Sequence, residues 1–315
     1  MPAFSPEFEP VTAFECVMRF WELLLLIRLR RAASGNSLRA AWNWMLAAWF
    51  ICCLSTLLGI DGLDSHIPNS FAWISARHLA GYVAGVFMLA PMVSVLGARM
   101  PGGRAWSVFV VAPMILVLLW PAISEAFQSK GQSPIELGGP AVLGFLLVLL
   151  MAFGNYFGTA NTTAAVLYTA AIMARIGPVA GWHNAGLLPW IASGFPPVAG
   201  YLWLRRLTEL RSRKPLDALS AGNRCWFVFR DFFGIVWAKR VMDRMNVFAA
   251  REGWGIHLSL DGFDIVEPDL AVGSEQMDRP IAILEWLLSR FGGENWRREL
   301  LGDSYVSKSD ECREV

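Results

Sequence analysis

Residues 139–157 of this chain read GPAVLGFLLVLLMAFGNYF, an apolar run without a charged side chain. A helix needs roughly 20 apolar residues to cross the hydrocarbon core of a bilayer. Further runs of this kind flank it, and together they contain a single charged residue, Arg175. We therefore predict an all-α, polytopic membrane helix bundle with six transmembrane helices. The predicted spans are residues 40–60, 79–98, 105–124, 139–157, 162–177 and 185–204.

The composition of the whole chain agrees with a membrane protein. Hydrophobic residues make up 55% of the 315 residues and charged residues only 17%, which is too apolar for an ordinary soluble domain. The net charge of +1 gives no reason to expect nucleic acid as a partner. We predict that the lipid bilayer is the main partner of residues 40–204.

The basic residues are distributed unevenly around the predicted spans. Cytoplasmic flanks of membrane helices collect Lys and Arg, which predicts a cell-membrane protein, with the inner membrane of a bacterium as the expected site, and both termini in the cytoplasm. The loop 158–161 carries no charge, so this rule does not assign it to either side of the membrane. The alternative is that spans four and five form one re-entrant unit, with both termini still in the cytoplasm. The basic residues on the predicted cytoplasmic side are Arg28, Arg30, Arg31, Arg39, Arg99, Arg104, Arg205, Arg206, Arg211, Arg213 and Lys214.

The N-terminal segment, residues 1–39, contains an amphipathic pattern over residues 11–31. Glu15, Arg19 and Glu22 share one face at helical spacing, while Phe14 and Leu24 supply apolar area. The run LLLLI is too short to span a membrane and is flanked by charge. We expect this helix to lie on the inner leaflet, with its terminal arginines attracted to anionic lipid.

The polar part after the last span, residues 205–303, is predicted to form a small α+β cytoplasmic module. Arg230 and Asp231 interrupt its apolar stretch, which argues against a seventh span. The predicted elements are an amphipathic helix over residues 225–251, a hairpin over residues 256–267 and a helix over residues 280–291. Residues 304–315 are predicted to be disordered.

The hairpin is predicted from the sequence IHLSLDGFDIVE. Asp261 and Gly262 suit a two-residue type I′ turn. This turn would pair Leu260 with Phe263 and Leu258 with Ile265.

The last predicted span contains the least regular helical sequence, AGLLPWIASGFPPVAGYLWL. Prolines remove backbone donors, and helices broken within a membrane expose carbonyls that bind substrates or ions in transporters. A kinked helix whose free groups are satisfied by its neighbours is the alternative. The candidate substrate-binding residues are Pro189, Ser193, Gly194, Pro196 and Pro197.

Three histidines are assigned to the outer face: His66, His78 and His183. Imidazole ligates zinc, copper and iron, so these residues are the candidate metal or haem ligands. Hydrogen bonding to headgroups or neighbouring loops is the alternative, because the chain has no tight spacing such as HxxxH. Cys52 and Cys53 are expected to pack as small hydrophobic side chains.

No recognised catalytic motif occurs in the chain, so an enzyme is unsupported and no cofactor is predicted. The predicted spans hold almost no ionisable residue, which argues against a proton-coupled carrier. The leading hypothesis is a non-catalytic, permease-like or scaffold subunit of a membrane complex, whose C-terminal module binds a protein partner. The alternatives are a solute transporter with its site at the last span and an outward-facing metal or haem protein.

Overall fold

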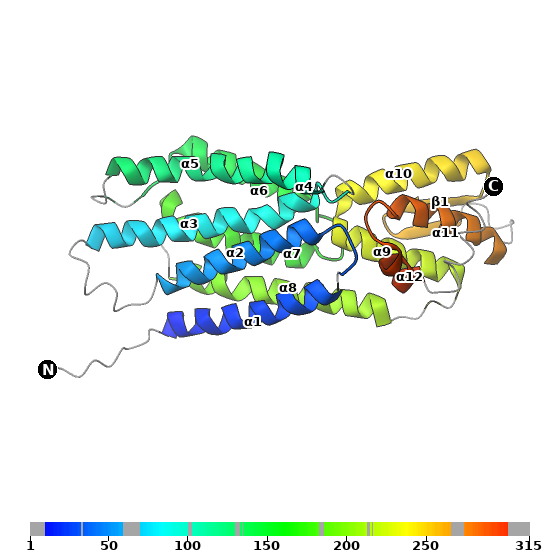
Figure 1. Ribbon diagram of the computed structural model, residues 1–315, viewed down its shortest axis with the longest axis horizontal. Helices are drawn as coiled ribbons and strands as arrows, with labels where there is room; N and C mark the ends of the chain where they lie inside the picture. The colour runs from blue at the N-terminus through cyan, green and yellow to red at the C-terminus, as the bar shows by residue number, and fades with distance from the viewer. Residues whose placement is uncertain are drawn as a thin grey trace.

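The long helices of the chain lie side by side in one bundle (Figure 1). The computed structural model of the protein describes residues 10–32, 34–58, 70–99, 103–129, 133, 135–182, 186–212, 215, 217–265 and 274–301. The bundle consists of α1 (Pro10–Ala32), α2 (Arg39–Leu57), α3 (Ser70–Val95), α4 (Gly103–Trp106) with the π-helical turn η2 (Ser107–Val111) and α5 (Ala112–Ser129), α6 (Gly139–Gly154), α7 (Thr162–Ile176) with the 3-10 turn η3 (Gly177–Ala180), and α8 (Leu188–Ser212).

Each of the six apolar runs predicted as a span forms a helix. Helix α3 begins at Ser70 rather than at residue 79, and α8 continues to Ser212. Among the helices of these six runs, α8 is the least apolar because its C-terminal turns carry three arginines and Glu209. The helices long and apolar enough to cross a membrane are, within the described residues, Arg39–Leu57, Trp73–Val95, Ser107–Ser129 and Thr162–Ala180; α6 is apolar but shorter.

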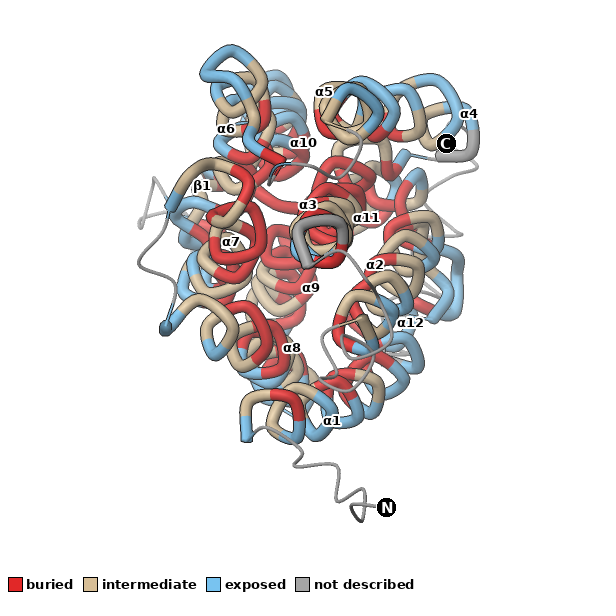
Figure 2. The backbone as a smooth tube through the Cα atoms, turned by 90° about the vertical axis from the view of Figure 1, so that its left-hand side faces the viewer, coloured by how far each residue is buried: buried red, intermediate tan, exposed pale blue. Residues whose placement is uncertain are grey.

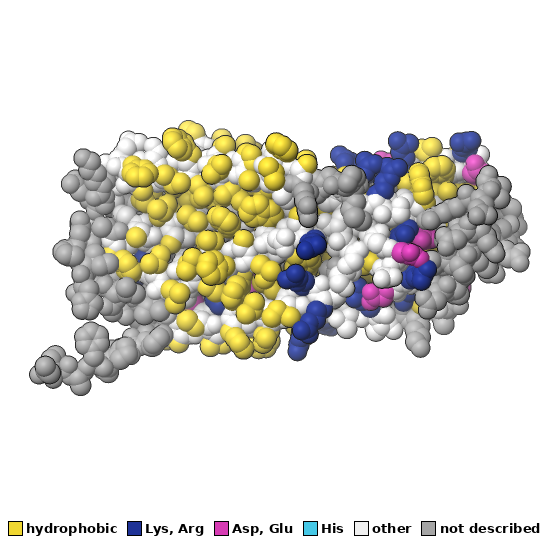
Figure 3. Space-filling model, viewed as in Figure 1, with side chains coloured by type: hydrophobic (Ala, Val, Ile, Leu, Met, Phe, Trp, Pro, Cys, Tyr) yellow, Lys and Arg dark blue, Asp and Glu magenta, His cyan; other side chains and the backbone are white. Residues whose placement is uncertain are grey.

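The outer surface of the bundle is apolar, as expected for a protein in contact with lipid. Figure 3 shows hydrophobic side chains spread over the bundle and charged side chains collected at and beyond its module end. Phe109, Trp120 and Phe127 are each at least 70% exposed, which would be costly in water. Viewed along the bundle, buried residues face the middle and exposed residues the periphery (Figure 2). These helices are therefore compatible with a membrane protein.

The N-terminal helix α1 differs from the sequence-based expectation. It packs along α8 and α2, parallel to the bundle axis, rather than across the end of the bundle (Figure 1). Its buried face carries Arg19 and Glu22, while Phe20 and Trp21 on the opposite face are more than half exposed. The amphipathic pattern is correct, but its polar side points into the protein. An interfacial helix would point its polar side to water.

The C-terminal part forms a compact module at one end of the bundle. The predicted helix over residues 225–251 is two helices, because Gly234 adopts a positive φ of 79° between them. The predicted helix over residues 280–291 begins earlier and contains Pro280. The elements are α9 (Ala218–Phe233), α10 (Ile235–Glu252), β1 (Ile256–Ser259), β2 (Gly262–Ile265), α11 (Ser274–Leu288) and α12 (Glu294–Leu301).

The hairpin is confirmed, but its predicted register is wrong. Leu258 pairs with Phe263 and Ser259 with Gly262, so the turn residues are Leu260 and Asp261. A contact with α9 accounts for this register: the Phe263 N–H donates to Asn223 Oδ1 at 2.7 Å. A side chain at Gly262 would collide with the side-chain amide of Asn223. Predicted hairpin residues 266 and 267, and the predicted disordered tail 304–315, lie outside the described residues.

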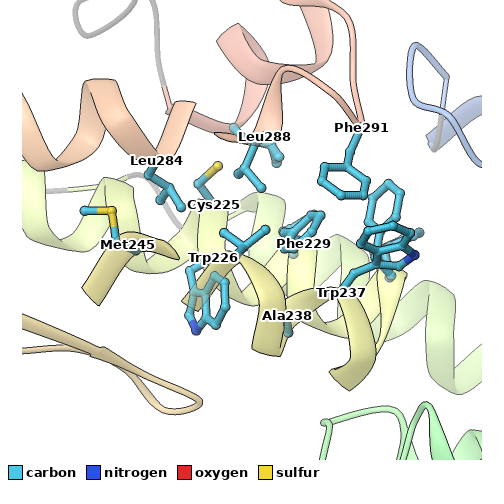
Figure 4. Close-up of a cluster of buried hydrophobic side chains, with 14 of the residues drawn as sticks. Cys225, Trp226, Phe229, Trp237, Ala238, Met245, Leu284, Leu288 and Phe291 are labelled. Atoms are coloured by element: carbon cyan, nitrogen blue, oxygen red, sulfur yellow. The ribbon is translucent and has the colours of Figure 1, made fainter. Parts of the chain in front are cut away.

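The module has its own aromatic core (Figure 4). Phe229 stacks on Phe233 with ring centroids 4.9 Å apart, and Phe291 meets both rings edge-on. Trp237 and Met245 of α10 are buried in the same core. The apolar face of α10 therefore packs within the module. A protein partner bound through this module remains a prediction.

The core of the module continues into the bundle. Trp237 Nε1 donates to the carbonyl of Val95 at 3.1 Å, and the N–H of Ser37 donates to the carbonyl of Phe291 at 2.7 Å. Leu207 and Leu210 of α8 belong to the same cluster of buried side chains. These contacts attach the module to the segment before α2, to the C-terminal end of α3 and to the C-terminal turns of α8.

Candidate functional site in the helix bundle

A charged cluster lies between α1 and α8. Arg19 is 3% exposed and Glu22 is 8% exposed, and their side chains form an ion pair one helical turn apart. One turn further toward the N-terminus, Glu15 Oε1 accepts a hydrogen bond from Ser193 Oγ at 2.9 Å. Buried charges are expensive unless they are paired and hydrogen-bonded, and in a membrane they mark functional sites by default.

The prolines of α8 explain where Arg19 binds. An α-helical N–H at residue 196 would donate to the carbonyl of Ala192, four residues earlier. Pro196 has no N–H, so this carbonyl is left free. Arg19 Nη2 donates to it at 3.2 Å. The missing backbone bond is thus replaced by a side-chain bond from α1.

The predicted substrate residues are brought together only in part. The residues Ser193, Gly194 and Pro196 lie at the contact with α1: Ser193 binds Glu15, and a Cβ on Gly194 would be 3.4 Å from the ring of Phe14. Pro197 lines the cavity described below. Pro189 is the second residue of α8, where a missing N–H is tolerated. The helix continues through both interior prolines, and the carbonyl freed at Ala192 is satisfied by α1, as the alternative of a helix whose free groups are met by its neighbours expects.

A cavity of about 100 Å³ lies next to the charged cluster, between α1, α2, α3, α7 and α8. Its wall is almost wholly apolar, and Glu22 is the charged residue among those that line it. It extends from Glu22 and Tyr168 to Leu38 and Phe232 at the module end. The lining residues include Leu25, Leu26, Leu29, Ala41, Met45, Pro91, Met92, Val95, Ala164, Ala165, Pro196, Pro197, Ala199 and Gly200.

Aromatic rings form much of this wall: Trp42, Tyr156, Tyr168 and Trp203. Tyr156 and Trp203 pack edge-to-face with centroids 5.3 Å apart. Trp203 also lies 6.0 Å from Phe232, the α9 residue that closes the module end of the cavity. Tyr168 Oη donates to Met45 Sδ at 3.5 Å. The site therefore combines one carboxylate with several aromatic side chains.

Arg175 forms a separate buried cationic site on α7. It is 8% exposed, and its Nη1 donates to Ser55 Oγ at 3.5 Å. The Nε and Nη2 atoms are buried and have no partner among the described residues. Glycines allow α3 to approach here, because a Cβ on Gly85 would be 3.6 Å from Arg175 Cβ. Gly81 and Gly85, four residues apart on α3, both face α7 and thus pack within the chain.

The cysteine prediction agrees with the structure. Cys52 is 1% exposed, Cys53 is half-buried, and both are free thiols on α2.

The candidate metal site stays a prediction, because only one of its three histidines lies within the described residues. His66 and His183 lie outside the described residues, so the three predicted ligands cannot be placed together. His78 lies on α3 and its Nδ1 is buried without a hydrogen-bond partner. No group of three potential metal ligands occurs in the ranges that the structure describes.

A second charged cluster joins the module to the bundle. Asp231 of α9 is 1% exposed, so its charge is buried at this junction. Its carboxylate accepts from Arg230 Nε at 2.9 Å and pairs with Arg206 at 3.4 Å. The backbone N–H of Ala160 donates to the same carboxylate at 3.3 Å. The uncharged loop 158–161 therefore meets its charged partners on α8 and α9.

Sequence reasoning missed the three charged residues of α1 as site residues. Their spacing of four and then three residues was visible, and it correctly predicts one shared face. The error lay in assigning that face to the membrane surface. Once α1 is part of the bundle, the argument that the membrane region lacks ionisable residues no longer holds.

No family model, curated protein or solved structure matches this chain.

Proposed function

We propose that this protein is a polytopic protein of the cytoplasmic membrane that binds a small lipophilic molecule inside its helix bundle. The observation that carries the proposal is the apolar cavity lying directly against the buried Arg19–Glu22 pair. Ligand pockets are typically apolar with a few placed polar groups. The transporter hypothesis from the sequence is thus favoured over a scaffold without a ligand.

The proposal includes a revised topology. Helix α1 runs parallel to α8, since Phe14 contacts Trp190 near the start of both helices and Leu25 lies against Gly200 further along. Its first residue, Pro10, therefore lies at the end of the bundle away from the module (Figure 1). With α1 crossing the membrane as well, seven segments cross, and the two ends of the chain lie on opposite sides.

The arginines at the module end support a cytoplasmic module. Arg28, Arg30 and Arg31 at the end of α1, Arg39 at the start of α2, and Arg99 and Arg205 are all exposed there. Positive charge at one end of a bundle is typical of the cytoplasmic side.

Binding of a small neutral apolar molecule tests the proposal. We expect tert-butylbenzene to bind the protein in nanodiscs above its uptake by protein-free nanodiscs. Ala165→Leu fills part of the cavity from its wall and should abolish the binding that exceeds uptake by protein-free nanodiscs. Val166→Leu enlarges the neighbouring side chain, which is 47% exposed, and should leave binding unchanged. Equal loss in both variants, or absence of saturable binding both of tert-butylbenzene and of its charged analogue phenyltrimethylammonium to the wild-type protein, would refute the site.

A further inference from the structure

We propose that the ligand of this cavity is a small lipophilic monocation, and that Glu22 is its counter-charge. This inference rests on the proposed function and specifies its ligand class. It follows from the charges around the cavity, from the aromatic side chains in its wall and from its size.

The charges between α1 and α8 do not balance. Glu15, Arg19 and Glu22 together carry one excess negative charge when all are ionised. Arg19 binds Glu22 Oε2 and the carbonyl of Ala192, and it does not line the cavity. One bound cation would neutralise the excess.

Arg175 is the other buried arginine among the described residues of the bundle, and it lies away from the cavity wall. Arg175 lies two turns of α7 beyond Tyr168, toward the end away from the module. Its Nη1 is held by Ser55, and it does not line the cavity. Within the described residues, no Lys or Arg lines the cavity. An anion would therefore meet the Glu22 carboxylate without a compensating cation, which disfavours that ligand class.

The aromatic side chains suit an organic cation better than a hydrated metal ion. Trp42, Tyr156, Tyr168 and Trp203 present π-systems, which attract cations and recognise quaternary ammonium groups. A single carboxylate supplies too few oxygen ligands for Ca²⁺ or Mg²⁺. A neutral polar solute would find almost no hydrogen-bonding groups on this wall.

The volume of the cavity limits what it can hold. An engineered apolar cavity of about 150 Å³ binds benzene. A cavity of about 100 Å³ therefore seats a group of similar or slightly smaller size, such as a trimethylammonium group. The part of the ligand beyond this group would extend along the apolar residues Leu25, Leu26 and Leu29 of α1.

Phenyltrimethylammonium and tert-butylbenzene have nearly the same shape and differ in charge, so they isolate the predicted preference. We would measure both by equilibrium dialysis against nanodiscs, with protein-free nanodiscs as the blank. Wild-type protein is expected to bind the cation at least tenfold more tightly than the neutral compound. Equal or weaker binding of the cation would overturn the inference.

Substitutions then assign the preference to one residue. Glu22→Gln keeps the shape of the side chain but removes its charge. The variant should bind the cation and tert-butylbenzene about equally tightly, with binding of tert-butylbenzene unchanged from the wild-type protein. Glu15→Gln is the matched control because it removes the same charge at a residue that contacts Ser193 and does not line the cavity; it should lower the cation preference less than Glu22→Gln does. Equal loss in both variants, or a preference retained in Glu22→Gln, would contradict the role of Glu22.

The outcomes separate the two proposals. If neither compound binds the wild-type protein, the proposed function fails. If the neutral compound binds and the cation has no advantage, only the ligand class is wrong. Should Glu22→Gln not fold, as judged by circular dichroism and thermal unfolding, the wild-type comparison of the two compounds still decides the ligand class.

Discussion

Arg19 on α1 donates a hydrogen bond at 3.2 Å to the carbonyl of Ala192 on α8, a carbonyl that Pro196 leaves without its helical partner. This contact joins an N-terminal charge to a proline-interrupted helix more than 170 residues away in the chain. It makes α1 a member of the bundle and brings two glutamates with it. The described bundle thus contains buried charge in addition to Arg175 of α7.

Removal of one partner of the buried ion pair should be strongly destabilising. Arg19→Met leaves Glu22 buried without its partner, and we expect the free energy of unfolding to fall by about 3–5 kcal/mol. Replacing both residues, as in Arg19→Met with Glu22→Met, should recover much of this loss because no lone charge remains. Reversible unfolding in mixed detergent micelles measures all three proteins.

Arg28→Met serves as the control for this experiment. Arg28 is exposed at the end of the same helix, so its substitution should change stability by no more than about 0.5 kcal/mol. A loss in Arg19→Met as small as that of the control would mean that Arg19 is not buried in the bundle.

Gly234 should be essential for the docking of the module. It adopts a φ of 79°, which favours glycine, and an added Cβ would overlap the side chain and carbonyl of Asn155. Asn155 in turn accepts from the N–H of Ile235 at 2.7 Å and donates through Nδ2 to the carbonyl of Phe233 at 3.2 Å. We expect Gly234→Ala to lower stability by about 3 kcal/mol or more, from strain and steric overlap together.

The matched control for Gly234 is Gly253, which also has a positive φ, 65°, but has no atom within 4 Å of an added Cβ. Gly253→Ala should cost only the backbone strain, about 1–2 kcal/mol. Thermal unfolding and the rate at which a protease releases the module are the measurements. Equal effects of the two substitutions would show that the contact with Asn155 does not hold the module in place.

The buried thiol of Cys225 should make stability depend on alkaline pH. Burial raises the pKa of Cys225 from 9.0 to about 12 in the folded protein. The unfolded chain therefore loses this proton first, so the stability contributed by the neutral thiol is complete below about pH 9 and is lost as the pH rises toward 12. The loss amounts to at most about 1.4 kcal/mol per pH unit.

Comparison with Cys225→Ala isolates this effect, because the other groups that titrate at alkaline pH are common to both proteins. Unfolding free energies measured between pH 8 and 11 should decline more steeply for the wild-type protein. Parallel curves would mean that Cys225 is accessible to water in the folded state.

The sequence predicts the helices of the bundle well because a long apolar run has few alternatives to a helix in lipid. The sequence predicts the packing of a helix less well where a contact with a residue distant in the chain determines it. The amphipathic pattern of Glu15, Arg19 and Glu22 fits a membrane surface as well as a bundle seam, and only the packing against Ala192 and Ser193 distinguishes the two. Local sequence therefore identified the face but not its partner.

The hairpin illustrates the same limit at smaller scale. Asp261 and Gly262 are favourable turn residues, yet the turn lies one residue earlier because Asn223 of α9 binds the N–H of Phe263. Likewise, the helix predicted over residues 225–251 divides at Gly234, where the loop after α6 docks through Asn155. In both cases a side chain remote in sequence outweighs the local preference.

The side of the membrane on which α1 begins tests the account most directly. Epitopes placed before Pro10 and after Leu301 would be exposed to protease in right-side-out and in inverted membrane vesicles. A crossing α1 predicts that the N-terminal epitope is cleaved only in right-side-out vesicles and the C-terminal epitope only in inverted ones. Cleavage of both epitopes in the same vesicle orientation would place the two ends on one side and contradict the seven-segment bundle with its buried charges.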